Sequence, residues 1–137
     1  SIACEITVEG VSPLDFGEHI KNEDGTAEGW VRVSLDGTVV FSSKKYTLAP
    51  DDSVESFARK GHFRLKVENA QPSSAVKVKL RSRDLKFTVF PNDWQIFYLL
   101  GDHSSGLFDV YYGGQLIIDD SNGEFSADVE IEAFCVK

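Results

Sequence analysis

Methionine is absent from this sequence, cysteine occurs only twice and proline four times. No apolar run approaches the roughly 18 residues that a membrane helix needs, so we expect no membrane insertion. Positive charge is scarce, because 14 Lys and Arg stand against 22 Asp and Glu. The resulting net charge of −8 argues against nucleic acid as the main partner. The missing methionine and the start at Ser1 indicate N-terminal processing, by removal of an initiator methionine or of a signal peptide.

The two cysteines, Cys4 and Cys135, stand near opposite ends of the sequence. The sequence has no Cys-x-x-Cys pair and no Cys/His cluster, so neither a zinc site nor a dithiol redox centre is expected. Two cysteines that close nearly the whole chain suit a structural disulfide in an oxidising compartment. A pair of buried free thiols is the alternative.

Apolar and polar residues alternate with a period of two along much of the sequence. Its 137 residues, 42% hydrophobic and 26% charged, suit a single domain over residues 1–137. Apolar and polar residues alternate over 2–8 and 125–135, which predicts strands with one buried and one polar face. The same reasoning predicts strands at 30–35, 38–41, 62–68, 75–81, 85–90, 94–100, 107–112 and 115–118.

Turn residues separate these strands every eight to twelve positions. Asp36-Gly37 predicts a hairpin, because both residue types favour the positive φ of tight turns, and Gly113-Gly114 offers a second tight turn. Residues 51–60 are the one candidate for a short helix. Together these features predict an all-β fold, an antiparallel β-sandwich of immunoglobulin-like type, with a closed barrel as the second choice.

Charge is unevenly distributed, with an excess of Lys and Arg in residues 59–86. If 62–68 and 75–81 pair as a hairpin, one outer face carries Arg64, Lys66, Lys77, Lys79 and Arg81. The terminal strands would point acidic residues outward, namely Glu5, Glu9, Asp128, Glu130 and Glu132. Two solvated faces are the simple interpretation. Oppositely charged faces would instead favour head-to-tail docking of copies, which propagates into filaments.

Motifs for catalysis or metal binding are missing. The sequence has no His-Glu-x-x-His zinc motif, no Gly-x-Ser-x-Gly elbow and no phosphate loop. Asp15, Glu18 and His19 lack a partnered nucleophile, so we expect no enzyme, no cofactor and no metal. The acidic pairs at 51–52 and 119–120 fit solvated turns better than a calcium site. Exposed aromatic residues could form a sugar-stacking platform, although core packing is the simpler role for Trp30, Trp94, Tyr98, Tyr111 and Tyr112.

Short motifs near both ends resemble a known family. Cys4–Ile6 is followed by Leu14–Gly17 (Leu-Asp-Phe-Gly), and Gly113–Leu116 precedes Gly123–Ile131, which leads into the last strand. This pattern resembles the secreted spore-coat-U-type domains and related bacterial fimbrial subunits. The resemblance implies an immunoglobulin-like sandwich, export to the cell surface and assembly into a fibre. It also implies that a neighbouring subunit completes the sandwich with a donor strand, and that a periplasmic chaperone and an outer-membrane usher serve as further partners.

From these observations we expect a structural subunit of an extracellular filament or fimbria that polymerises with copies of itself through strand complementation. The alternative is a secreted β-sandwich module that binds carbohydrate or another surface. Residues 1–9 are the candidate donor strand, set free by a hinge at residues 10–13.

The donor strand would turn Ile2, Cys4, Ile6 and Val8 toward the core, since these residues share one phase of the alternation. The acceptor would be the last strand of the next subunit, through Phe125, Ala127, Val129, Ile131 and Ala133. Cys135 shares the phase of this second set, so Cys4 of one copy could bond to Cys135 of the next. The conservative alternative is a Cys4–Cys135 disulfide within one chain.

Overall fold

Antiparallel strands make up the fold. The structure, a computed structural model, describes residues 3–16, 20–22, 29–42, 46–48, 59–118 and 128–136. These residues contain no helix, and therefore none long and apolar enough to cross a membrane. The strands are β1 (Glu5–Ser12), β2 (Ile20–Asn22), β3 (Gly29–Val33), β4 (Val39–Phe41), β5 (Tyr46–Leu48), β6 (Gly61–Glu68), β7 (Ala75–Ser82), β8 (Phe87–Phe90), β9 (Gln95–Tyr98), β10 (Gly106–Ile118) and β11 (Val129–Val136).

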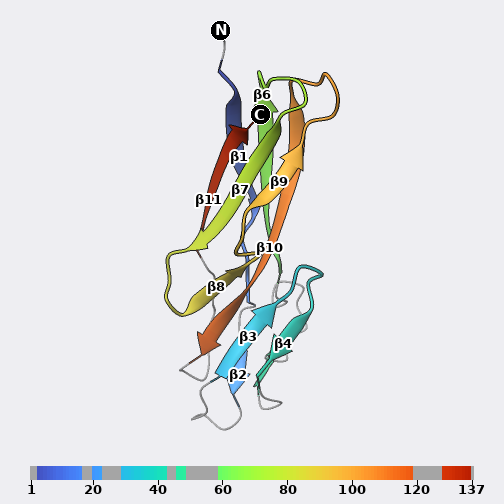
Figure 1. The fold of residues 1–137 in the computed structure, drawn as a ribbon. Coiled ribbons are helices and arrows are strands. Elements are labelled where there is room, and N and C mark those ends of the chain that lie inside the picture. Colours follow the sequence, from blue (N-terminus) through green and yellow to red (C-terminus); the bar gives the residue numbers. More distant parts are fainter. Residues whose placement is uncertain are drawn as a thin grey trace.

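The strands form two main sheets that pack face to face (Figure 1). The larger sheet has the order β1-β6-β10-β3-β4, with β8 also paired to β10, and the smaller sheet has the order β11-β7-β9. A separate pair joins β2 to β5. Within the described residues both main sheets end in edge strands, so the predicted β-sandwich is confirmed and the closed barrel is wrong. The immunoglobulin-like subtype stays a prediction.

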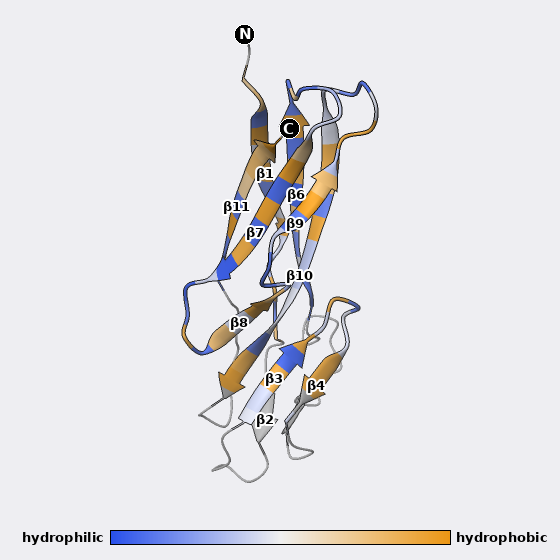
Figure 2. Ribbon diagram, viewed as in Figure 1, coloured by the Kyte–Doolittle hydropathy of each residue, from blue (hydrophilic) through white to orange (hydrophobic). Residues whose placement is uncertain are grey.

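The core lies between the two sheets and follows the predicted alternation. Leu65 and Val67 of β6 enter it from the larger sheet, and Val76, Val78 and Leu80 of β7 enter it from the smaller one. All five side chains are at most 1% exposed, and burial of each contributes about 1.5–3 kcal/mol. Figure 2 shows the matching alternation of apolar and polar segments along β7. Because these residues must face inward, the residues between them are fixed on the outer faces.

The expected hairpin between 62–68 and 75–81 is wrong. These segments form β6 and β7, but β6 pairs with β1 and β10 whereas β7 pairs with β11 and β9. The connection through residues 69–74 therefore crosses from one sheet to the other. Asn69 and Ser73 adopt positive φ angles of 58° and 61° in this connection. The expected basic face is consequently divided between the two sheets: Arg64 and Lys66 lie on one, and Lys77, Lys79 and Arg81 lie on the other.

The expected turn at Gly113-Gly114 is also wrong, because one strand, β10, runs straight through it. The two glycines serve close packing instead of a turn. A Cβ on Gly113 would lie 2.1 Å from the carbonyl oxygen of Val33, and a Cβ on Gly114 would lie 2.2 Å from the Phe87 ring. The second half of β10 can thus pair with β3 and β8 on its two sides.

The Asp36-Gly37 turn is confirmed as the link between β3 and β4. Gly37 has a φ of 84°, whereas Asp36 is not among the residues with positive φ. The Asp36 carboxylate accepts a hydrogen bond of 2.9 Å from the backbone of Thr38, which closes the turn. The pattern missed the short strands β2 and β5. The helix expected at 51–60 lies outside the described residues except for its last two positions, where Arg59 bridges to Asp15.

Candidate functional site

One side of the sandwich is closed by the predicted disulfide. Cys4 and Cys135 are bonded within the chain, with their Cα atoms 6.5 Å apart. Cys4 precedes β1 and Cys135 lies near the end of β11, and Figure 1 shows the start of β1 and the end of β11 at the same end of the molecule. We call the side formed by β1 and β11 the disulfide edge. The structure therefore shows the disulfide within one chain, instead of the expected bond between Cys4 of one copy and Cys135 of the next.

Residues expected in a donor strand are already engaged in the chain's own larger sheet. Ile6 and Val8 stand opposite Val67 and Leu65 in the β1–β6 register. Ile6 is only partly buried and Val8 is 42% exposed, as expected for an edge strand. The hinge predicted at residues 10–13 coincides with a shift of register between Gly10 and Ser12. Ile2 lies outside the described residues.

The residues expected to accept a donor lie on β11, opposite β7. Val129, Ile131 and Ala133 are partly buried against the core, as their alternation predicts. Phe125 and Ala127 lie outside the described residues. β11 has no second strand partner among the described residues, and the same holds for β1. The disulfide edge therefore presents two unpaired strand edges, one from each sheet.

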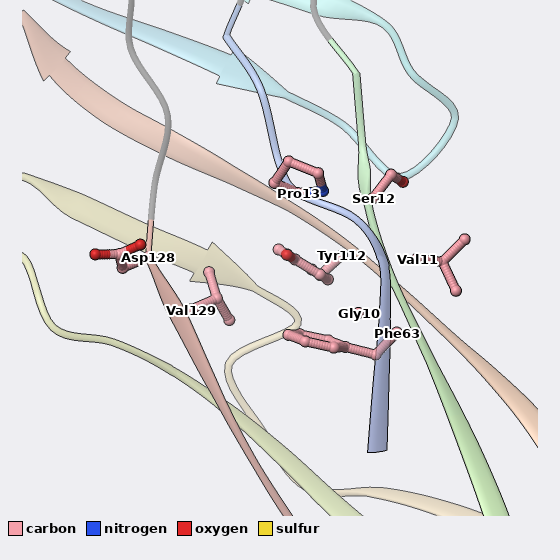
Figure 3. A pocket seen from close by; sticks show the side chains of 8 residues that line it. All are labelled: Gly10, Val11, Ser12, Pro13, Phe63, Tyr112, Asp128 and Val129. Atoms are coloured by element: carbon pink, nitrogen blue, oxygen red, sulfur yellow. The ribbon is translucent and has the colours of Figure 1, made fainter.

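A cavity of about 270 Å³ opens on this side, where β1 ends and β11 begins. Its walls are mostly apolar and consist of Gly10, Val11, Ser12, Pro13, Phe63, Tyr112, Asp128 and Val129. The rings of Phe63 and Tyr112 stack with their centroids 5.2 Å apart (Figure 3). Burial raises the pKa of the Tyr112 hydroxyl. With this lining, the cavity suits an apolar side chain better than a charged ligand.

The opposite side of the sandwich also has one strand edge from each sheet that is unpaired among the described residues, but no disulfide joins these two strands. It is formed by β9 and by residues 106–112 of β10, and we call it the apolar edge. Phe97 and Phe108 link its two strands inside the sandwich, with ring centroids 5.5 Å apart. β9 pairs only with β7, and this half of β10 pairs only with β6, among the described residues. Leu100 beside it is 76% exposed and Leu107 is 68% exposed.

A polar cluster occupies the outer face of the larger sheet. The Asp109 carboxylate accepts hydrogen bonds from His62 Nε2 at 2.7 Å and from Arg64 Nε at 3.2 Å. These bonds hold the pKa of Asp109 below its usual value, and the bond from His62 has the larger effect. The His62 and Tyr111 rings stack with their centroids 4.4 Å apart. Lys60 Nζ lies 4.3 Å from the centroid of the Tyr111 ring. The sequence pattern missed this cluster, because its residues meet only through the β6–β10 register.

The five aromatic residues considered as a sugar platform do not gather in one place. Tyr112 is buried in the core, and Tyr111 lies on the outer face of the larger sheet. Trp30 lies on β3, where Arg32 covers its ring. Trp94 and Tyr98, in contrast, lie close together in sequence, Trp94 immediately before β9 and Tyr98 at its end.

Other chemistry considered from the sequence is not assembled in the described residues. They contain no group of three or more His, Cys, Asp or Glu side chains placed to hold a metal ion. The acidic pairs at 51–52 and 119–120 lie outside them, as do Glu18 and His19, while Asp15 bonds through its backbone to Arg59.

Comparisons with known proteins bear on none of these surfaces. The resemblance to spore-coat-U-type and fimbrial subunits stays a prediction. No protein-family model, curated protein or solved structure matches the chain.

Proposed function

We propose that this protein is a non-enzymatic structural subunit of a secreted, extracellular filament, in which copies join through the free strand edges of their sandwiches. The observation that carries the proposal is that, among the described residues, each side of the molecule has two strand edges without a strand partner. Unpaired strand edges are templates for strand addition by another chain. The apolar edge in addition exposes Leu100 and Leu107, which a partner would cover.

The directions of the strands allow both sheets to continue into a neighbour at once. β1 and β10 are each antiparallel to β6, so they run in the same direction. β11 and β9 are each antiparallel to β7 and likewise share a direction. A copy placed with the same orientation could therefore pair its β1 with β10 and its β11 with β9, both in parallel register. This contact joins unlike surfaces and leaves one free edge at each end, so it propagates.

Charge opposes the competing contact between two disulfide edges. Glu5 and Glu9 of β1 are exposed along this side, whereas Glu130 and Glu132 of β11 are paired with arginines. Like charges placed directly opposite one another destabilise strand pairs. The disulfide edge is therefore better matched to the uncharged leucines of the apolar edge than to a second disulfide edge. The intrachain disulfide holds β1 in place, so β1 supplies an edge for pairing and is not itself exchanged.

Electron microscopy and sedimentation of the oxidised protein test this function. We expect filaments, or a concentration-dependent ladder of oligomers. The double variant Leu100→Lys/Leu107→Lys places charge on the apolar edge and should remain monomeric, since edge lysines block strand addition. Leu85→Lys is the matched control, because Leu85 is fully exposed in the turn before β8. Native protein that is monomeric at all concentrations, or equal assembly of both variants, would contradict the proposal.

The second candidate, a secreted module that binds carbohydrate, is favoured by one specific observation, the aromatic residues on the outer face of the smaller sheet. Glycan binding by a protein that stays monomeric would favour this candidate alone. The two functions are compatible in one molecule because they use different surfaces.

A further inference from the structure

The outer face of the smaller sheet carries a compact group of two aromatic rings and two lysines. The rings of Trp94 and Phe134 meet edge to face, with centroids 5.3 Å apart. Lys77 Nζ lies 5.3 Å and Lys79 Nζ lies 5.5 Å from the centroid of the Trp94 ring. We call these four residues the aromatic–lysine cluster.

The cluster follows from the register of the three strands. Lys77 of β7, the central strand of this sheet, stands opposite Phe134 on β11 and opposite Ile96 on β9. Trp94 immediately precedes β9, and its ring reaches across β7 to Phe134. Ile96 and Tyr98 continue the apolar surface along β9, with exposed fractions of 47% and 67%. From Trp94 to Tyr98 the surface extends over about 13 Å of strand.

The positive charge of this face is only partly neutralised. Glu132 pairs with Arg81 at 3.4 Å, and Glu130 pairs with Arg83. The two acidic residues of β11 are therefore engaged by arginines. Among the described residues, neither Lys77 nor Lys79 has a carboxylate partner, and both contact the Trp94 ring. An acidic protein with a net charge of −8 thus presents a local excess of cations beside the exposed Phe134 ring and the half-buried Trp94 ring.

We propose that the aromatic–lysine cluster binds an anionic polysaccharide, a chain of sugar rings that carry carboxylates. The C–H faces of pyranose rings pack on exposed aromatic side chains, and the carboxylates would meet the two ammonium groups. Both halves of the cluster are needed for such a ligand, whereas a neutral glycan would leave the lysines unused. The combination of rings and cations also suits single-stranded nucleic acid. The disulfide favours polysaccharide, because disulfides persist mainly in extracellular and other oxidising compartments.

Affinity electrophoresis in native gels that contain polygalacturonate tests the site. We expect the intact, oxidised protein to be retarded, and retardation to decrease with added salt because ion pairs contribute. Trp94→Ala should weaken binding by about tenfold, the scale of one aromatic contact. Lys77→Gln/Lys79→Gln should weaken binding at least as much. Each substituted side chain lies outside the buried core, and circular dichroism verifies that each variant is folded.

Tyr111→Ala is the matched control. Tyr111 also contacts a lysine, Lys60, but on the outer face of the larger sheet. This variant should bind polygalacturonate like the native protein. Gels with dextran should give no retardation, since that polymer lacks the carboxylates.

Four results would overturn the proposal. They are absence of retardation by polygalacturonate, unchanged binding in both cluster variants, equal retardation by poly-glutamate, and tighter binding of a single-stranded oligonucleotide. Poly-glutamate supplies the same charge without sugar rings, so equal binding would show charge attraction alone. The oligonucleotide result would assign the cluster to nucleic acid.

Discussion

Cys4 and Cys135 join two strands that belong to different sheets. β1 pairs with β6, and β11 pairs with β7, so the disulfide is the covalent link between the two sheets on this side. The bonded residues are 131 positions apart, and their bond encloses nearly the whole chain. The disulfide therefore constrains the unfolded chain strongly and also holds β1 against its own sandwich.

Removal of this bond should destabilise the protein. For Cys4→Ala/Cys135→Ala we expect the free energy of unfolding to fall by about 2–5 kcal/mol, since closure of so long a loop has a large entropic effect on the unfolded chain. Urea denaturation followed by tryptophan fluorescence measures the change. On a non-reducing gel the native protein should run as one monomer band. A covalent ladder that collapses on reduction would contradict the intrachain bond.

A substitution at Gly113 tests whether this glycine of β10 is needed for close packing against β3. Gly113→Ala places a Cβ 2.1 Å from the Val33 carbonyl oxygen, so we expect a loss of about 1–3 kcal/mol or more. Gly10→Ala is the control, because a Cβ there has no neighbour within 4 Å. Both changes affect the unfolded chain in the same way, so the difference between their melting temperatures reports the clash. Equal melting temperatures would contradict the close approach of β3.

The polar cluster around Asp109 predicts how the stability of the folded protein changes in acid. The pKa of Asp109 is lowered in the folded protein, so its ionised form favours folding above the usual aspartate pKa. This contribution is lost as the pH falls through the lowered value. In NMR titrations, His62→Phe should raise the Asp109 pKa toward its usual value while keeping a ring on Tyr111. Arg64→Gln should raise it less, because the His62 hydrogen bond is the larger cause. A larger effect of Arg64→Gln would reverse that assignment.

The sequence predicts the strands of this fold better than their partners. Alternation locates β6, β7 and β11 to within a few residues, because burial of one face is a local property of each segment. The connection at 69–74 carries no local sign of whether it forms a hairpin or crosses between sheets, so the partners of β6 and β7 were predicted wrongly. The pair Gly113-Gly114 is ambiguous in the same way, since glycine suits both a turn and a close approach of strands.

The candidate sites depend on contacts that are distant in sequence. The phase of the alternation correctly placed both cysteines toward the core, but that phase is the same for a bond within one chain and between two chains. Trp94 meets Phe134, and His62 meets Asp109, only because particular strands are neighbours in a particular register. Such pairs cannot be recognised before the strand order is known.

Hydrogen–deuterium exchange on assembled and monomeric protein tests the central claim most directly. The Leu100→Lys/Leu107→Lys variant supplies the monomer, and peptide-level mass spectrometry compares the two forms. Edge-to-edge assembly predicts slower exchange in assembled protein for β1, β11, β9 and residues 106–112 of β10, because their free amides gain partners. The β3–β4 hairpin should exchange equally in both forms. Protection absent from both edges of the assembled protein would contradict the account.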